Sequence, residues 1–177
     1  MIDWEHVSLE NLAAVVSEKL RAKGIEVILV GGACVTIYSH NRYQSYDLDF
    51  VTYEDMKKVR KVLMGEGFQE KGQYFKHKKC PYLIEFVTPP VAIGSDVIHE
   101  FEEIKTKLGT IHLLRLEDSV KDRLASYFHW NDREGLMQAI DICLERKVNL
   151  KEVKNWAEKE GHLKKFKEFF EQLQKRK

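Results

Sequence analysis

The sequence is poor in cysteine, has almost no net charge and contains no long apolar run. Its three cysteines, Cys34, Cys80 and Cys143, are far apart and odd in number, which argues against a disulfide framework and favours a reducing compartment. No run could span a bilayer and no secretory leader opens the chain, so we expect a cytoplasmic protein without a membrane partner. The formal net charge of +1 creates no overall field toward nucleic acid, although it is compatible with a local basic surface.

Hydrophobic residues make up 44% of the 177 positions, which is enough for one buried core. Short apolar runs with strand spacing precede Arg115, and helical spacing follows it. We therefore expect an α+β fold, with a sheet-and-helix core over residues 1–115 and a C-terminal helical part over 116–177 packed on it. The core should contain helices over 8–23, 32–39 and 54–64, the last capped by Thr52, and strands over 25–30, 48–52, 73–77, 81–87, 104–108 and 110–114.

Two carboxylates open the second of these strands. Alternate side chains of a strand share a face about 7 Å apart, so Asp47 and Asp49 should point the same way. Two anions on one face repel each other and lose hydration, and a divalent cation relieves both effects. Upstream, Gly31 and Gly32 end an apolar strand, where a tight turn can bring backbone N–H groups close to a ligand. The pattern favours a metal beside a phosphate.

A third carboxylate, Glu85, interrupts an otherwise apolar strand over 83–87. A lone acid there is unfavourable unless it is paired or bound to metal. An edge strand with Glu85 in water, or an ion pair to a lysine, would explain it equally well. Asp47 and Asp49 also have a plainer alternative, a strand that opens at the surface with two hydrated acids.

These residues carry a family resemblance. Three stretches resemble motifs of the polymerase beta-type nucleotidyltransferase superfamily, namely Val30-Gly31-Gly32, Ser45-Tyr46-Asp47-Leu48-Asp49-Phe50 and Ile84-Glu85-Phe86. The chain is most similar to the small bacterial and archaeal members, including toxin-type and abortive-infection nucleotidyltransferases. Stretches 116–121 and 139–142 resemble the downstream helical motifs more loosely. The chain departs from the pattern in having Ala33 after the glycine pair and a longer interval before Asp47.

The resemblance implies a nucleotidyltransferase-like mixed β-sheet and a two-metal site. Asp47, Asp49 and Glu85 would be the catalytic residues and would hold Mg²⁺ or Mn²⁺, the hard cations that carboxylate oxygens suit. Amides near Gly31 and Gly32 would bind the nucleotide phosphates. Further nucleotide-binding candidates are Ser45, Arg42 and Lys121. Arg42 is equally explained as a surface arginine, and Lys121 as an i,i+3 partner of Asp118.

The implied function is Mg²⁺-dependent transfer of a nucleoside monophosphate from an NTP to an acceptor hydroxyl. The acceptor is open among RNA or tRNA, a protein side chain and a small molecule. The alternative is a non-catalytic nucleotide- or RNA-binding module of the same fold, as part of a toxin–antitoxin system. The sequence 76–79, Lys-His-Lys-Lys, fits either a nucleic-acid contact or a solvated turn. The preferred NTP, the oligomeric state and the roles of Asp118 and Asp141 are not indicated.

Overall fold

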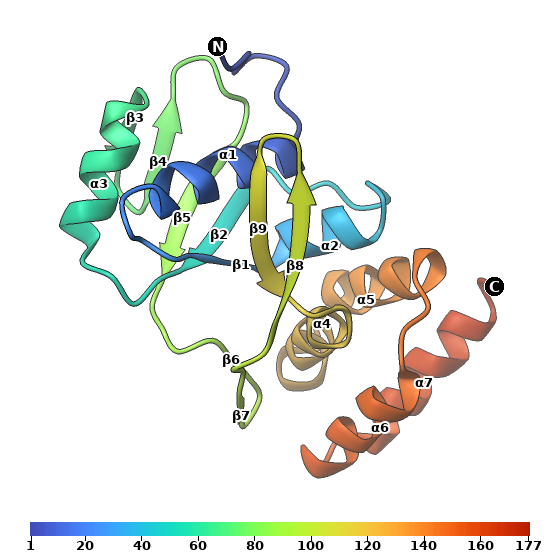
Figure 1. The fold of residues 1–177 in the computed structure, drawn as a ribbon. Helices are drawn as coiled ribbons and strands as arrows, with labels where there is room; N and C mark the ends of the chain where they lie inside the picture. The colour runs from blue at the N-terminus through green and yellow to red at the C-terminus, as the bar shows by residue number, and fades with distance from the viewer.

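Seven helices and nine strands make up the computed structural model, which describes residues 1–177 (Figure 1). The strands are β1 (Ile28–Val30), β2 (Asp47–Val51), β3 (Phe68–Lys71), β4 (Tyr74–His77), β5 (Leu83–Val87), β6 (Ala92–Ile93), β7 (Asp96–Val97), β8 (Phe101–Thr106) and β9 (Gly109–Leu114). The helices are α1 (Leu9–Arg21), α2 (Gly32–Tyr38), α3 (Met56–Gly65), α4 (Leu116–Trp130), α5 (Arg133–Glu145), α6 (Leu150–Lys159) and α7 (Leu163–Gln174).

Seven strands form one sheet in the order β3-β4-β5-β2-β1-β9-β8. Strand β2 is parallel to β5 and β1 is parallel to β9, whereas the other neighbours are antiparallel. The sheet is therefore mixed, as expected. Strands β6 and β7 form a separate two-stranded hairpin.

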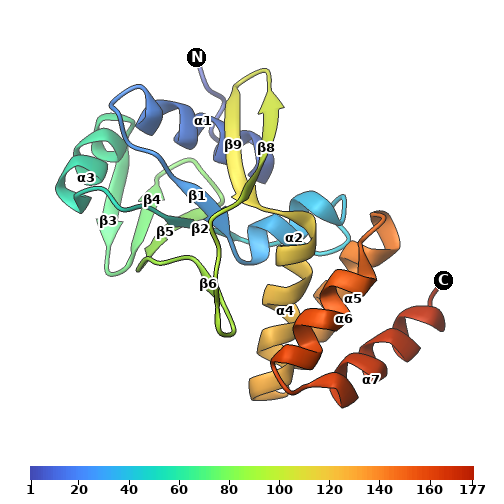
Figure 2. The ribbon, with the colours of Figure 1, turned by 60° about the horizontal axis from the view of Figure 1, so that its bottom comes forward.

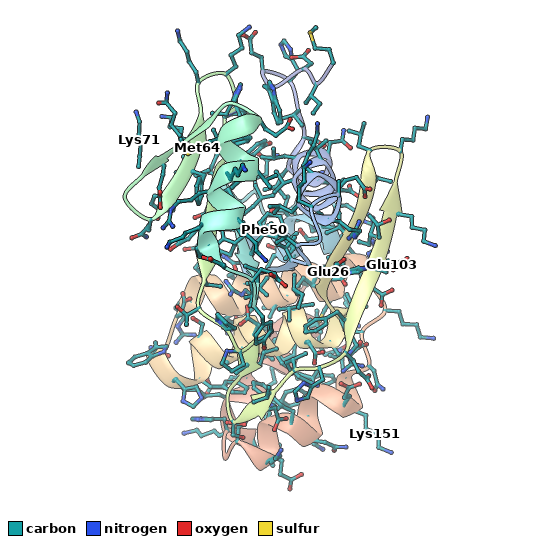
Figure 3. All side chains as sticks on the ribbon, turned by 60° about the vertical axis from the view of Figure 1, so that its left-hand side comes forward. Glu26, Phe50, Met64, Lys71, Glu103 and Lys151 are labelled. Atoms are coloured by element: carbon teal, nitrogen blue, oxygen red, sulfur yellow. The ribbon has the colours of Figure 1, made fainter.

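The two faces of the sheet differ in cover. Helices α1 and α3 pack on one face, where the side chains of Leu29, Phe50 and Ile84 are completely buried (Figures 1 and 3). Because strand side chains alternate, Asp49 and Glu85 lie on the opposite face and are only half-buried. The sheet thus has one sealed face and one face that is partly open to water.

The four C-terminal helices pack together beside α2 at one end of the sheet (Figure 2). One cluster of 44 buried residues runs through the whole chain and includes Leu29 of the sheet and Phe169 of α7. Helix α4 begins at Leu116, where the composition changes. The division into units 1–115 and 116–177 stays a prediction, since a single core joins them. No helix is both long and apolar enough to cross a membrane.

The β6–β7 hairpin reaches from the sheet to the end of α6. The Ser95 backbone N–H donates to Glu160 Oε1 at 2.9 Å, and Lys159 Nζ lies 2.5 Å from Asp96 Oδ1. Gly94 has φ +58°, a backbone conformation that favours glycine, and a Cβ atom there would also displace the end of the Glu160 side chain, which it would approach to 2.7 Å. The hairpin tip is thereby fastened to the C-terminal helices.

The structure corrects two local expectations. Thr52 does not cap α3; its hydroxyl donates to the Glu26 carbonyl at 2.7 Å, and Asp55 caps the helix by accepting from the Lys57 N–H. Strand β3 and the β6–β7 hairpin were not expected from the sequence. Strand β3 has a single buried residue, Phe68, so it lacks the apolar alternation that marks a strand.

Candidate active site

Strands β2 and β5 bring three carboxylates together on the open face of the sheet. Asp49 lies directly opposite Glu85 in the parallel pair, and Asp47 projects from the same face two residues earlier. One carboxylate oxygen from each residue lies within 4.8 Å of the others. The predicted convergence of Asp47, Asp49 and Glu85 is confirmed as geometry, whereas their catalytic roles stay predictions.

A chain of hydroxyl groups holds Asp47 in place. The Ser45 hydroxyl lies 2.9 Å from Asp47 Oδ1, and the Ser45 backbone N–H donates to Thr36 Oγ1 at 2.9 Å. Thr36 in turn donates to the Gly32 carbonyl at 3.3 Å, which ties the start of α2 to the acidic strand. Ser45 is itself buried. Its hydroxyl therefore orients a carboxylate in this structure, whereas its predicted contact with a nucleotide remains untested.

The glycine pair approaches the acidic residues from β1. Gly31 has φ +69°, and a Cβ atom there would lie 2.6 Å from Asp49 Oδ2. A Cβ atom on Gly32 would lie 3.2 Å from Ser45 Oγ. No side chain caps the first turn of α2, which leaves its first N–H groups without the usual partner. The absence of a side chain at Gly31 thus lets the backbone approach the Asp49 carboxylate closely.

The surroundings of the Asp49 carboxyl group disfavour its ionised form. Burial, followed by the nearby charges of Asp47 and Glu85, raises the pKa of Asp49 to about 6. No hydrogen bond from the protein stabilises the ionised form of this carboxylate. The expectation that at least one clustered acid has a raised pKa is confirmed. A cation at this position would remove the repulsion that raises it.

Helix α4 supplies a basic residue that the sequence reasoning missed. Arg123 and Asp122 line a cleft of about 210 Å³ together with Gly31 and Asp49. Arg123 Nε donates to Asp122 Oδ2 at 3.1 Å and its Nη1 donates to Gln138 Oε1 at 3.2 Å. Burial is the largest single influence on Arg123 and would lower its pKa, but the charge of Asp122, the hydrogen bond to it and the smaller contributions of Cys34 and Tyr43 together raise the pKa. The guanidinium also favours the ionised form of Asp49.

The sequence contained a signal for Arg123. It follows Val120 by three residues and precedes Tyr127 by four, and both of these are completely buried. Residues with that spacing lie on one side of a helix, so Arg123 borders the apolar face that packs on the core. Lys121, three residues before Leu124, borders the same face on its other side, so the spacing alone does not distinguish the two residues.

Tyr43, in the loop before β2, is a second residue that was not anticipated. A Cβ atom on Gly32 would lie 3.4 Å from Tyr43 Cε1. Burial raises the pKa of its hydroxyl, with a smaller contribution from Glu134. Tyr43 therefore adds an aromatic wall beside the glycine turn.

The structure does not bring Arg42 or Lys121 to this cleft. Arg42 pairs with Glu145 on α5. Lys121 Nζ lies 3.2 Å from Asp118 Oδ1 and 2.6 Å from Glu152 Oε1, within a largely buried ion-pair cluster. The ion pair with Asp118 is the alternative that the helical spacing offered. Nucleotide binding by either residue stays a prediction for which this arrangement gives no support.

The donor set fits a hard divalent cation. All three side chains offer carboxylate oxygens, and the cluster contains no histidine or cysteine. Oxygen ligands suit Mg²⁺ or Mn²⁺ better than Zn²⁺ in proteins. The unpaired, raised-pKa Asp49 is the kind of group that binding of such a cation would relieve. The identity of the metal stays a prediction.

The mixed sheet, the glycine turn and the acidic cluster together define a nucleotidyltransferase-like fold. The crystal structure of an antigenic nucleotidyltransferase-like protein from Paracoccidioides brasiliensis matches it with a TM-score of 0.59 and 16% sequence identity. The match covers 76% of this chain and 73% of that chain. At this identity the likeness shows the fold alone. No family model matches the sequence, and no curated protein matches it either. Kinship to toxin-type or abortive-infection enzymes therefore stays a prediction.

Proposed function

We propose that this protein transfers a nucleoside monophosphate from an NTP to an acceptor hydroxyl. The observation that carries the proposal is the convergence of Asp47, Asp49 and Glu85 on one sheet face against the bare backbone of Gly31. A merely structural site has no need of three mutually repelling carboxylates, one of them without a hydrogen-bond partner.

In the proposed reaction, the acceptor oxygen attacks the α-phosphorus, the bond to the bridging oxygen breaks and pyrophosphate leaves. Asp47, Asp49 and Glu85 would hold Mg²⁺ or Mn²⁺, which when bound neutralises charge on the phosphates and the attacking oxygen. Ser45 fixes the orientation of Asp47 through its hydroxyl. Glu85, the acid farthest from the glycine turn in strand order, receives or relays the acceptor proton.

The two sides of the acidic cluster have different chemistry. Gly31 on β1 and Arg123 on α4 line the cleft on one side, where a free backbone and a guanidinium suit anionic phosphate oxygens. Glu85 on β5 lies on the other side of β2. We therefore place the triphosphate on the β1 side of the cluster and the acceptor on the β5 side.

The direct test is incubation with each α-labelled NTP and Mn²⁺, with cellular RNA and protein as acceptors. We expect label to enter a macromolecule and pyrophosphate to appear in equal amount. Asp49→Asn should abolish both products. Glu10→Gln, an exposed acid on α1 that forms no ion pair, is the matched control and should retain full transfer.

Two results would contradict this proposal. Binding of NTP and Mn²⁺ without any transfer by the wild type would leave the non-catalytic binding module as the function. Transfer that survives in Asp49→Asn would remove the acidic cluster from the reaction. Product analysis of the labelled macromolecule then identifies the acceptor.

A further inference from the structure

The open face of the sheet continues past the acidic cluster onto the β3–β4 hairpin. Cross-strand partners share a face, and Tyr74 is the partner of Glu85 on β5. Lys71 is the partner of Tyr74 on β3, so Asp49, Glu85, Tyr74 and Lys71 form one row across four strands. Neighbouring strands lie about 4.8 Å apart, which places the Lys71 backbone about 10 Å from that of Glu85.

Lysines dominate this extension. A hollow of about 310 Å³ is lined only by Gly67, Gln69, Lys71, Lys76 and Lys78. It contains no acidic side chain, and none of its three lysines forms an ion pair within the chain. All three are exposed, and Figure 3 shows Lys71 projecting outward from the hairpin. Elsewhere on the hairpin, Glu70 pairs with Arg60 on the covered side of the sheet. Within the hairpin strands, the lysines without an ion pair therefore lie on the face that carries the acidic cluster.

This placement separates the two ends of the proposed reaction. Arg123 and Gly31 lie on the β1 side of the acids, whereas the lysines lie beyond Glu85 on the opposite side. A donor triphosphate on the β1 side leaves the lysine face for the acceptor. The lysines favour an acceptor that carries several negative charges along its length.

We propose that the acceptor is a single-stranded polynucleotide whose backbone lies along Lys71, Lys76 and Lys78. The proposal rests on the nucleotidyltransferase function proposed above. The terminal hydroxyl of the strand reaches Glu85, and Tyr74, half-buried between Glu85 and Lys71, offers a ring to a base near that end. The hydroxyl oxygen forms the new bond to the α-phosphorus, its proton leaves through Glu85 and pyrophosphate departs.

The chemistry of the hollow favours a polynucleotide over an acidic protein. Protein partners are held by apolar or aromatic anchors in desolvated pockets, and no hydrophobic residue lines this hollow. Lysines act as point charges toward phosphates, and those at alternate positions of a strand recur about every 7 Å. Lys76 lies on β4 and Lys78 lies two residues later, in the turn that follows the strand, so successive positive charges border the hollow and suit a backbone that repeats its charge.

The test measures binding without turnover. Labelled single-stranded RNA and DNA of about twelve nucleotides are titrated into the full protein in EDTA at several salt concentrations, with fluorescence anisotropy as the readout. The double variant Lys71→Gln/Lys76→Gln removes two charges from the hollow. Each lost phosphate contact lowers the salt slope of a single strand by about 0.7, so affinity at 0.1 M salt should fall about 25-fold for the pair.

The matched control is Lys57→Gln/Lys61→Gln. Both lysines are exposed on α3, which packs on the covered side of the sheet, and neither forms an ion pair. This variant has the same net charge as the test variant and should bind like the wild type. Binding of RNA alone, or of RNA and DNA equally, supports the proposal. No binding of either strand, equal losses in both double variants, or tighter binding of an acidic peptide than of the oligonucleotides would overturn it.

The two proposals fail separately. Asp49→Asn should lose Mn²⁺ binding yet still bind the oligonucleotide in EDTA, whereas Lys71→Gln/Lys76→Gln should still bind Mn²⁺ and NTP. A wild type that binds Mn²⁺ and NTP but no oligonucleotide would retain the nucleotidyltransferase assignment and refute the acceptor. A wild type that binds neither Mn²⁺ nor NTP would refute the proposed metal and nucleotide site.

Discussion

Replacement of Asp49 by asparagine should make the metal-free protein more stable at neutral pH. The pKa of Asp49 is about 6 in the folded protein, above the value of about 3.9 for an unfolded chain. The folded state therefore binds more protons between these two values, and its stability falls as the pH rises from about 4 to about 6. Two pKa units correspond to about 3 kcal/mol, which water screening of this partly exposed side chain reduces to about 1–2 kcal/mol.

Asparagine keeps the shape of the side chain and removes the charge. In EDTA at pH 7.5, the free energy of unfolding of Asp49→Asn should exceed that of the wild type by about 1–2 kcal/mol. This difference raises the melting temperature by about 2–8 °C for a chain of this size. At pH 4, where Asp49 is largely protonated in the folded state, the difference should nearly vanish. Differential scanning calorimetry at the two pH values measures both.

Metal should reverse the order of the two proteins. At a Mn²⁺ concentration one hundred times its dissociation constant, the wild type should gain about 2.7 kcal/mol, which exceeds its deficit in EDTA, and Asp49→Asn should gain far less. Glu10→Gln removes an exposed charge of the same sign and should behave like the wild type throughout. A lower melting temperature for Asp49→Asn in EDTA at pH 7.5, or the same increase in Glu10→Gln, would refute the reasoning.

Further variants separate stability from binding. Leu124→Ala, at a completely buried position of α4, should cost about 2–5 kcal/mol of unfolding free energy in urea titration, and a cost below 1 kcal/mol would contradict the packing. Gly31→Ala should cost about 1–3 kcal/mol through its positive φ and should weaken Mn²⁺ binding by displacing Asp49, so unchanged Mn²⁺ titration would count against the close approach. Arg123→Ala should weaken NTP binding in calorimetric titration by about 1.5–3 kcal/mol. Lys121→Ala should leave NTP affinity unchanged and lower stability by about 1–2 kcal/mol, because the buried Asp118 and the partly buried Glu152 each lose one of two basic partners and keep Arg115. The opposite pattern in these two variants would assign Lys121 to nucleotide binding.

The acidic strand was predictable because its information is local. Asp47 and Asp49 are two residues apart, and strand alternation alone puts them on one face. Their relation to Glu85 depends on the β2–β5 pairing, 36 positions apart in the register, and only the family resemblance suggested it. The raised pKa of Asp49 then followed from like charges in a partly buried place.

The misses concern features that packing decides. Lys121 and Arg123 are two residues apart on one helix, and both are largely buried. Their partners come from different elements, Glu152 on α6 for Lys121 and Gln138 on α5 for Arg123, and no local pattern names those elements. Strand β3 was not predicted for a related reason. It is a strand because it pairs with β4, and its own sequence has no apolar alternation. Thr52 was misassigned because a hydroxyl near a helix start fits a cap or a contact with the neighbouring strand equally well.

The contacts between the tip of the β6–β7 hairpin and the end of α6 restrict where this gene can recombine with related genes. Ala92 and Ile93 of the hairpin line the acidic cleft, while Ser95 and Asp96 at its tip contact Glu160 and Lys159. A crossover near residue 115 would join a hairpin from one ancestor to helices from another. Such a chimaera would keep every acid of the cleft yet lose the matched contacts at the tip. The residues 94–96 and 159–160 should therefore be inherited together, although they are more than sixty positions apart.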